Sequence, residues 1–205
     1  MKKHISDKRQ KGFIITIAVA LSVIILRSTG ILILAGTAVY GTVWYTALLS
    51  VISLLPPMLF SFTYEKPEKR KKAGLVPSAA MTAAAVLLCM GINIIISLLS
   101  GTGADVPQYS DPWSFAAAVL CLCLLPALLE ELLFRGIITD ALCPCGEKLT
   151  VVLSAAAFAI VHSGVYAGIY AFCAGIILGI LRLRSGRLTA SAAAHFLTNL
   201  ISLII

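Results

Sequence analysis

The chain consists of long apolar runs separated by short polar or basic segments. A helix needs about 20 apolar residues to cross the hydrocarbon core of a bilayer. The runs do not alternate between apolar and polar positions, as the strands of a membrane barrel do. They predict an all-α, polytopic membrane helix bundle of about seven spans, within a range of six to eight. The predicted spans are 13–35, 38–62, 75–100, 113–139, 149–163, 165–181 and 188–205.

Two features of this pattern concern the ends and faces of the spans. The first boundary is open, because Arg27 and the three residues after it could also form an outer turn. The fifth and sixth spans are short and nearly continuous, with a predicted hinge at Ser163 and Gly164. Small residues recur at every fourth position of the sixth span, at Ala171, Gly175 and Gly179. This spacing predicts close contact with a neighbouring helix.

Composition agrees with the membrane assignment. The 205 residues are 60% hydrophobic and 12% charged, whereas soluble domains average about 45–50% apolar and about 25% charged residues. In lipid the backbone must satisfy its own hydrogen bonds, which favours helices. We therefore interpret residues 1–205 as a single integral membrane domain that has the lipid bilayer as its environment.

The net charge of +7 could suggest a nucleic-acid partner, but the distribution of basic residues does not. They gather in short segments, as the positive-inside rule expects of cytoplasmic loops. We predict a cytoplasmic N-terminus and no nucleic-acid partner. An apolar run from residue 13 to about 35 is longer than that of a signal peptide, about 7–15 residues, and predicts a retained first span. The basic segments are 2–11, 66–72, Lys148 and 182–187.

The fourth predicted span carries Glu130, Glu131 and Arg135 after a long apolar stretch. Each charge near the centre of a span costs roughly 2.5–3.5 kcal/mol, so intramembrane charges usually have a function. Glu131 and Arg135 are four residues apart and are expected to pair on one helix face. Glu130 points away from that pair and is suited to general base catalysis. Pro126 is expected to kink the helix and to open space beside the glutamates.

Two further spans carry polar groups in their interior. His162 lies near the end of the fifth, and His195 and Asn199 lie one turn apart on the seventh. At 1.5 Å per residue these side chains and Glu130 lie roughly 10–20 Å from their cytoplasmic ends, so they are expected to meet in one layer. One carboxylate and two imidazoles can hold a water molecule, with or without a metal. An amide can stabilise a developing oxyanion.

Several other polar groups have no partners of this kind. We interpret Asn93 and Arg27 as structural residues. Most of the six cysteines lie in apolar runs, where cysteine behaves as a small hydrophobic residue. Cys143 and Cys145 lie in a loop at a spacing found in metal sites. Because two further ligands are missing nearby, we interpret this pair as structural or incidental.

Three short motifs together indicate a family. EELLFRG at 130–136, FAIVH at 158–162 and HFLTN at 195–199 fit the patterns EExxxR, FxxxH and HxxxN. In this order and on separate spans they resemble the CPBP family of intramembrane proteases, also called the Abi or type II CAAX prenyl endopeptidase family. The motif-bearing core covers about 113–205, and the first three spans are similar to the family only in being hydrophobic.

The resemblance implies hydrolysis of a peptide bond in a membrane-associated peptide or a lipidated protein, inside a cavity that faces the cytoplasm. It implies that Glu130 and His162 activate the attacking water and that His195 and Asn199 stabilise the oxyanion. It gives the Glu131–Arg135 pair a supporting role. The use of a metal stays open, because Glu130, His162 and His195 could also form a zinc site with an open coordination position.

Two other functions stay open alongside the protease. Bacterial members of the family are linked to bacteriocin self-immunity, so a non-catalytic immunity protein in a bacterial plasma membrane is one alternative. A small proton-coupled transporter, with Glu130 and the histidines as a proton relay, is the other. The sequence lacks an evident internal repeat of 20–50 residues, which disfavours a transporter built from inverted repeats.

Overall fold

The computed structural model describes residues 2–61, 72–101 and 111–205. All the regular elements in these ranges are helical, and they form seven helices that correspond to the seven predicted spans. The predicted all-α membrane bundle is therefore confirmed. The elements are α1 (Lys2–Leu34), α2 (Val43–Ser61), α3 (Leu75–Ser100), α4 (Pro112–Ala118), η1 (Val119–Leu124), α5 (Leu125–Glu130), η2 (Glu131–Ile138), α6 (Thr139–Leu142), η3 (Cys143–Cys145), α7 (Glu147–Ile160), α8 (Val165–Ser185) and α9 (Leu188–Ile204).

The length and composition of several helices suit a membrane. Within the described residues, four helices are long and apolar enough to cross a bilayer, at Ser6–Leu34, Leu75–Ser100, Pro112–Cys145 and Val165–Ser185. Two shorter apolar helices, Val43–Leu59 and Leu188–Ile204, accompany them. Large apolar side chains cover the outside of the bundle; Leu32 and Leu98, for example, are each 78% exposed. Lipid is a solvent in which this outward-facing apolar surface carries no penalty.

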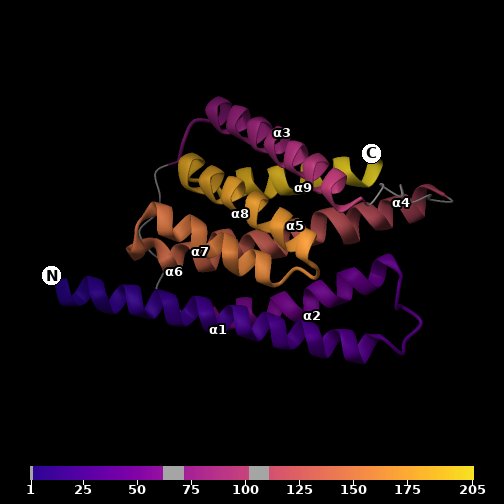
Figure 1. Cartoon of the computed structure of the whole chain (residues 1–205), viewed down its shortest axis with the longest axis horizontal. Helices are drawn as coiled ribbons and strands as arrows, with labels where there is room; N and C mark the ends of the chain where they lie inside the picture. The colour runs from indigo at the N-terminus through magenta and orange to yellow at the C-terminus, as the bar shows by residue number, and fades with distance from the viewer. Residues whose placement is uncertain (1, 62–71, 102–110) are drawn as a thin grey trace.

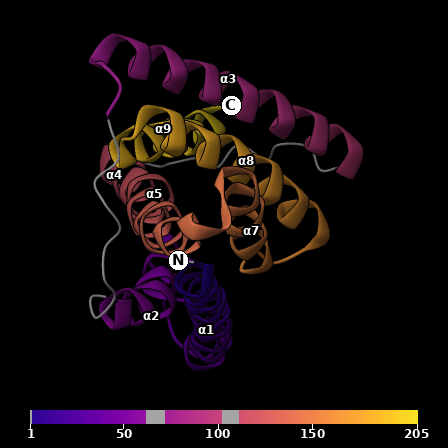
Figure 2. The ribbon, with the colours of Figure 1, turned by 90° about the vertical axis from the view of Figure 1, so that its left-hand side faces the viewer.

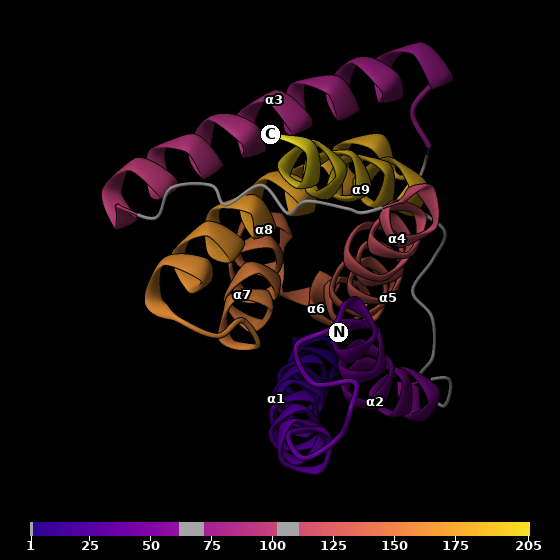
Figure 3. The same ribbon diagram turned by 90° about the vertical axis from the view of Figure 1, so that its right-hand side faces the viewer.

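The helices form layers around one long central helix (Figure 1). That helix runs from α4 to α6 and contacts α1 and α2 on one side and α9 on another. The helices α7 and α8 form an antiparallel pair beside it. The end-on views place α3 across α8 and α9, on the opposite side of the molecule from the α1–α2 hairpin (Figure 2 and Figure 3). The central helix is thereby enclosed by segments from both halves of the chain.

The ends of three helices differ from the predicted boundaries. Helix α1 continues through residues 27–30 to Leu34, so this stretch is not an outer turn. The connection between α1 and α2 covers residues 35–42 and is longer than predicted. Hydroxyl and backbone hydrogen bonds form successive turns in it, and Gly41 has a φ of 78°. Helix α7 ends at Ile160, three residues early, where a turn with Gly164 at φ 93° reverses the chain.

The described basic segments lie at one end of the bundle, on the left in Figure 1. Near the start of α1, Arg9 Nε donates to the Pro144 carbonyl oxygen at 2.9 Å. Arg187, between α8 and α9, donates to the Ala73 carbonyl oxygen at 3.0 Å. Lys148 is in the first turn of α7, next to the same end of the central helix. The predicted basic residues 66–71 lie outside the described residues.

The small residues of α8 allow the α7–α8 contact. A Cβ atom added to Gly175 would lie 2.9 Å from the Ala155 Cβ, and one added to Gly179 would lie 3.3 Å from a Val151 methyl carbon. These distances leave no room for a larger side chain at Gly175. The predicted close approach of α8 to a neighbouring helix is confirmed, and the neighbour is α7.

Candidate active site

The central helix has two wide turns around Glu130. In η1 and η2 the backbone follows the π-helical pattern; in η1, for example, the Leu125 N–H donates to the Leu120 carbonyl oxygen. Pro126 is the second residue of α5, just after the first wide segment. The chain therefore accommodates this proline by widening the preceding turn within one continuous helix. Single π-type turns occur often at functional sites, because they re-aim side chains without ending the helix.

Side chains from α6, α7 and α8 satisfy two carbonyl groups of η2. The Phe134 oxygen accepts from Thr139 Oγ1 at 2.8 Å and from Ser154 Oγ at 2.9 Å. The Arg135 oxygen accepts from Arg182 Nε at 3.1 Å. Buried carbonyl groups need such partners in a membrane interior. These bonds hold the wide segment that carries Glu131 and Arg135.

The predicted pair of Glu131 and Arg135 is present. Arg135 Nη1 lies 2.9 Å from Glu131 Oε1, and both side chains are fully buried. The guanidinium carbon also lies 4.3 Å from the centre of the Phe158 ring. A desolvated cation on an aromatic face gains about 2 kcal/mol. Carboxylate and ring offset part of the cost of burying this arginine, whose guanidinium nitrogens make no hydrogen bond of good geometry to the described residues.

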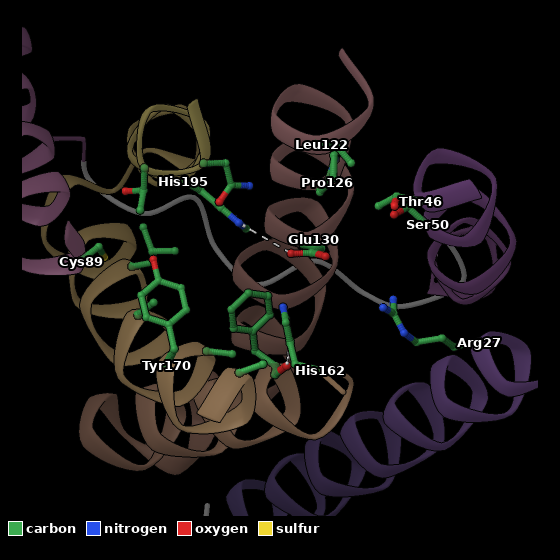
Figure 4. A pocket seen from close by; sticks show the side chains of 17 residues that line it. Arg27, Thr46, Ser50, Cys89, Leu122, Pro126, Glu130, His162, Tyr170 and His195 are labelled. Atoms are coloured by element: carbon green, nitrogen blue, oxygen red, sulfur yellow. Dashed lines mark hydrogen bonds and ion pairs between the residues drawn. The ribbon is translucent and has the colours of Figure 1, made fainter. Parts of the chain in front are cut away.

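His195 lies between the two glutamates, which the sequence did not indicate. Its Nδ1 is 3.2 Å from Glu131 Oε1 and its Nε2 is 3.7 Å from Glu130 Oε2 (Figure 4). An ionised carboxylate only accepts hydrogen bonds, so Nδ1 carries the proton that it donates to Glu131. Glu131 therefore contacts both Arg135 and His195. The assignment of this glutamate to Arg135 alone is incomplete, because α9 packs against η2.

His162 occupies the turn after α7, two residues beyond the end of the helix. Its Nδ1 lies 2.8 Å from the Phe158 carbonyl oxygen, and its ring packs edge-on against the Phe158 ring at 4.6 Å. Because a carbonyl oxygen only accepts, Nδ1 is the protonated nitrogen, and Nε2 of the neutral ring keeps its lone pair. The ring comes from the α7–α8 turn on the Glu130 side of the cavity (Figure 4).

A cavity of about 310 Å³ brings these groups together. Glu130, His162, His195 and Asn199, the side chains predicted to be catalytic, all line it. Fully buried Glu131 and Arg135 lie behind its wall. Such a cavity combines hydrogen-bond donors, a carboxylate and an imidazole lone pair in one space of low dielectric, where electrostatic stabilisation of a transition state is strong.

Residues 112–201 match the family model described as "Type II CAAX prenyl endopeptidase Rce1-like". All three motifs fall within the matched region. After this match we refer to residues 112–201 as the Rce1-like domain. The family resemblance inferred from the motifs is thereby confirmed. Comparisons with curated proteins and with solved structures gave no match.

The Rce1-like domain forms only part of the cavity wall. Arg27 of α1 and Thr46 and Ser50 of α2 line the cavity from outside the matched region, and Tyr170 of α8 lines it from within. The sequence signal for Arg27 was its charge within an apolar span. Its interpretation as a structural residue rests on the lack of partners like those of the glutamates and histidines, and nothing tests that role. Its position on the cavity wall was not predicted, and it follows from the packing of the α1–α2 hairpin against α5 and η1.

The side chains of the cavity include the residues predicted as possible zinc ligands, Glu130, His162 and His195. Among the described residues, no group of three or more His, Cys, Asp or Glu side chains is placed to hold a metal ion. Glu130 and His195 are close, whereas His162 bonds through Nδ1 to its own helix. Cys143 and Cys145 are free thiols outside any such group. The predicted zinc ligands therefore do not fit a metal in this arrangement, and the use of a metal stays a prediction.

Proposed function

We propose that the chain is an intramembrane endopeptidase that hydrolyses a peptide bond in a membrane-associated peptide or lipidated protein. The observation that carries this proposal is the cavity of the Rce1-like domain, lined by Glu130, His162, His195 and Asn199. A water molecule in that space could meet a general base and an oxyanion-stabilising group at once. The family match supports a protease, and the cavity supports the assignment of roles.

Glu130 and His162 are proposed to activate the water. The hydrogen bond from His162 Nδ1 to the Phe158 carbonyl oxygen keeps the Nε2 lone pair available. As the water oxygen attacks the carbonyl carbon of the scissile bond, its proton passes to the Glu130 carboxylate or to His162 Nε2. General acid–base groups of this kind typically contribute about 10²–10⁴-fold to the rate.

His195 and Asn199 are proposed to stabilise the oxyanion that forms on the substrate. Glu131 holds His195 through Nδ1, which directs Nε2 toward Glu130 and the cavity, and a second proton on the ring would make Nε2 a donor to the oxyanion. Asn199 lies one turn further along α9 on the same cavity. When the carbon–nitrogen bond breaks, the proton taken from the water returns to the leaving amine. The products are one new carboxylate and one new amine.

The Glu131–Arg135 pair is proposed to position His195. Fully buried, it touches neither cavity nor substrate, and it fixes the carboxylate oxygen to which His195 donates. Arg135 in turn rests on Phe158, whose carbonyl orients His162. One buried cluster therefore orients both imidazoles.

The orientation in the membrane is part of the proposal. The described basic segments share one end of the bundle, which the positive-inside rule favours for the cytoplasmic side. We infer a bacterial plasma membrane protein whose cavity is reached from the cytoplasm. Accessibility of a cysteine introduced at Lys148, measured with a membrane-impermeant reagent in intact and opened cells, tests this orientation.

Purified protein in liposomes tests the activity. Wild type is expected to cleave membrane-spanning or lipidated peptides, and Glu130→Ala is expected to lose cleavage while its thermal unfolding stays cooperative. Glu147→Ala is the matched control, because Glu147 is exposed at the start of α7. Full activity of Glu130→Ala would refute the assignment. Loss of cleavage on chelation, with recovery on adding zinc, would support the metal alternative.

A further inference from the structure

Arg27 is a second intramembrane arginine with a very different environment from Arg135. It lies inside the apolar span Ser6–Leu34, is only partly buried, and lines the catalytic cavity from α1. Charged side chains within spans are costly, and they almost always face a protein interior or a water-filled cavity with a partner. Arg27 is therefore expected to have a partner.

Within the described ranges, Arg27 has no protein partner. Its Nε is buried and makes no hydrogen bond there, and no described carboxylate forms an ion pair with it. The same cavity wall instead carries the Thr46 and Ser50 hydroxyls of α2 (Figure 4). A guanidinium beside hydroxyl groups is a donor-rich environment that suits an anion.

Arg27 lies deeper in the bundle than Glu130. Helix α1 and the central helix are antiparallel, and Gly12 packs against the Ala141 backbone. Arg27 and Pro126 are each fifteen residues from that contact along their own chain, or about 22 Å at 1.5 Å per residue. The Arg27 Cα is therefore about level with that of Pro126, roughly one helical turn beyond Glu130 as seen from the basic end, and its side chain extends back from that level toward Glu130 (Figure 4).

We propose that Arg27 is a positioning residue that binds a carboxylate of the peptide substrate. The planar guanidinium matches a carboxylate in two parallel hydrogen bonds. A carboxylate held there keeps the adjoining part of the peptide in the cavity that Glu130 also lines. The carboxylate can belong to the substrate's C-terminus or to an acidic side chain. This inference rests on the proposed endopeptidase function, and Arg27 lies outside the Rce1-like domain.

Three peptides of otherwise identical sequence distinguish binding of a C-terminal carboxylate from binding of an acidic side chain. The first ends in a free carboxylate, the second in a carboxamide, and the third is a carboxamide with aspartate as its last residue. We expect wild type to cleave the first with a kcat/KM about tenfold to hundredfold above that of the second, mainly through KM, as a charge-assisted hydrogen bond would give. Recovery with the third peptide would show that a side-chain carboxylate suffices.

Two variants assign the preference to Arg27. Arg27→Gln is expected to reduce the acid-to-amide ratio to about one, and Arg27→Lys to retain part of it. Arg184→Gln is the control, because Arg184 is exposed at the end of α8, and it should retain the full ratio. Equal cleavage of acid and amide by wild type would overturn the proposal. So would an equal loss on both peptides in Arg27→Gln, which would mean that Arg27 acts through Glu130.

Binding provides a readout that does not depend on cleavage. Fluorescence anisotropy of labelled acid and amide peptides with Glu130→Ala protein should show the same acid preference, and Glu130→Ala combined with Arg27→Gln should lack it. If wild type cleaves neither peptide but binding keeps the preference, the endopeptidase function fails and the carboxylate site stands. If wild type cleaves both peptides and binding shows no preference, the carboxylate site fails and the endopeptidase stands.

Discussion

The two sides of the cavity differ in how their arginines are paired. On the wall built by the Rce1-like domain, Arg135 has Glu131 at 2.9 Å and the Phe158 ring at 4.3 Å, and its side chain is fully buried. On the wall built by α1 and α2, Arg27 is partly buried and makes no ion pair with any described residue. The arginine of the first wall has its counter-ion within the protein. The second wall presents a cation to whatever enters the cavity.

This difference separates a structural charge from a charge that can serve a ligand. A buried ion pair becomes costly when one partner is removed, because the other is left uncompensated. An unpaired cation facing a cavity contributes no such pairing in the resting protein, so its removal costs little stability. The stability and activity of matched variants can therefore test the comparison, beginning with the arginines themselves.

The largest effect is expected for Arg135→Met. It leaves Glu131 buried without its cation, and a broken buried pair typically costs about 3–5 kcal/mol. Arg27→Met should leave the free energy of unfolding unchanged or raise it. Reversible unfolding of both variants in mixed micelles measures the difference. Similar losses in the two variants would show that Arg27 has a structural partner, and the contrast between the walls would be wrong.

A second large effect, this time on activity, is expected for Asn199→Ala. Removal of one oxyanion donor typically lowers kcat by about 10²–10³-fold. KM and the thermal unfolding midpoint should change little, since Asn199 faces the cavity. Single-turnover kinetics with a cleavable peptide measure this loss. A proton-coupled transporter would instead tolerate the change, so retained function with proton-gradient coupling would favour that alternative.

A moderate loss of stability is expected for Gly175→Ala, at the contact between α7 and α8. This contact positions the turn that carries His162. Gly175→Ala puts a Cβ 2.9 Å from the Ala155 Cβ, and overpacking of this kind typically costs about 1–3 kcal/mol. Gly91→Ala on α3 is the matched control, because a Cβ there meets no atom within 4 Å. Equal stability of the two variants in a detergent unfolding titration would show that the contact is not close-packed.

The smallest effect is expected for Asn93→Ala, since Asn93 does not line the cavity. Asn93 Nδ2 donates to Ser202 Oγ at 3.0 Å and links α3 to α9. Hydrogen bonds between membrane helices average about 0.6 kcal/mol, so the unfolding free energy should fall by about that amount and cleavage should be unchanged. A loss of cleavage comparable to that of Asn199→Ala would extend the functional region to α3.

Local spacing predicted much of the candidate site. The Glu131–Arg135 pair follows from four-residue spacing on one helix, and the turn at Gly164 follows from a polar break between apolar runs. The convergence of the motifs on one cavity followed from similar depth in the membrane. These predictions depend on distances along a single helix or on depth in the bilayer. Both can be calculated from the spacing of residues in the sequence.

Contacts between helices were harder to predict. The approach of His195 to both glutamates and the position of Phe158 between Arg135 and the two histidines depend on how α7 and α9 rotate against η2. The wide turns of η1 and η2 change that rotation locally. Apolar spans can pack in many rotations at similar energy, so hydrophobic pattern alone does not select one.

By itself the sequence determined that this protein is an α-helical membrane bundle and which residues of 113–205 are candidates for its chemistry. The reason is that burial of charge in lipid is expensive, and a chain that carries such charges shows them plainly among apolar residues. Only the tertiary structure decided that Glu131 also holds His195 and that Arg27 faces the cavity without a described partner. Partners on distant helices are selected by packing, and packing exists only in the folded bundle.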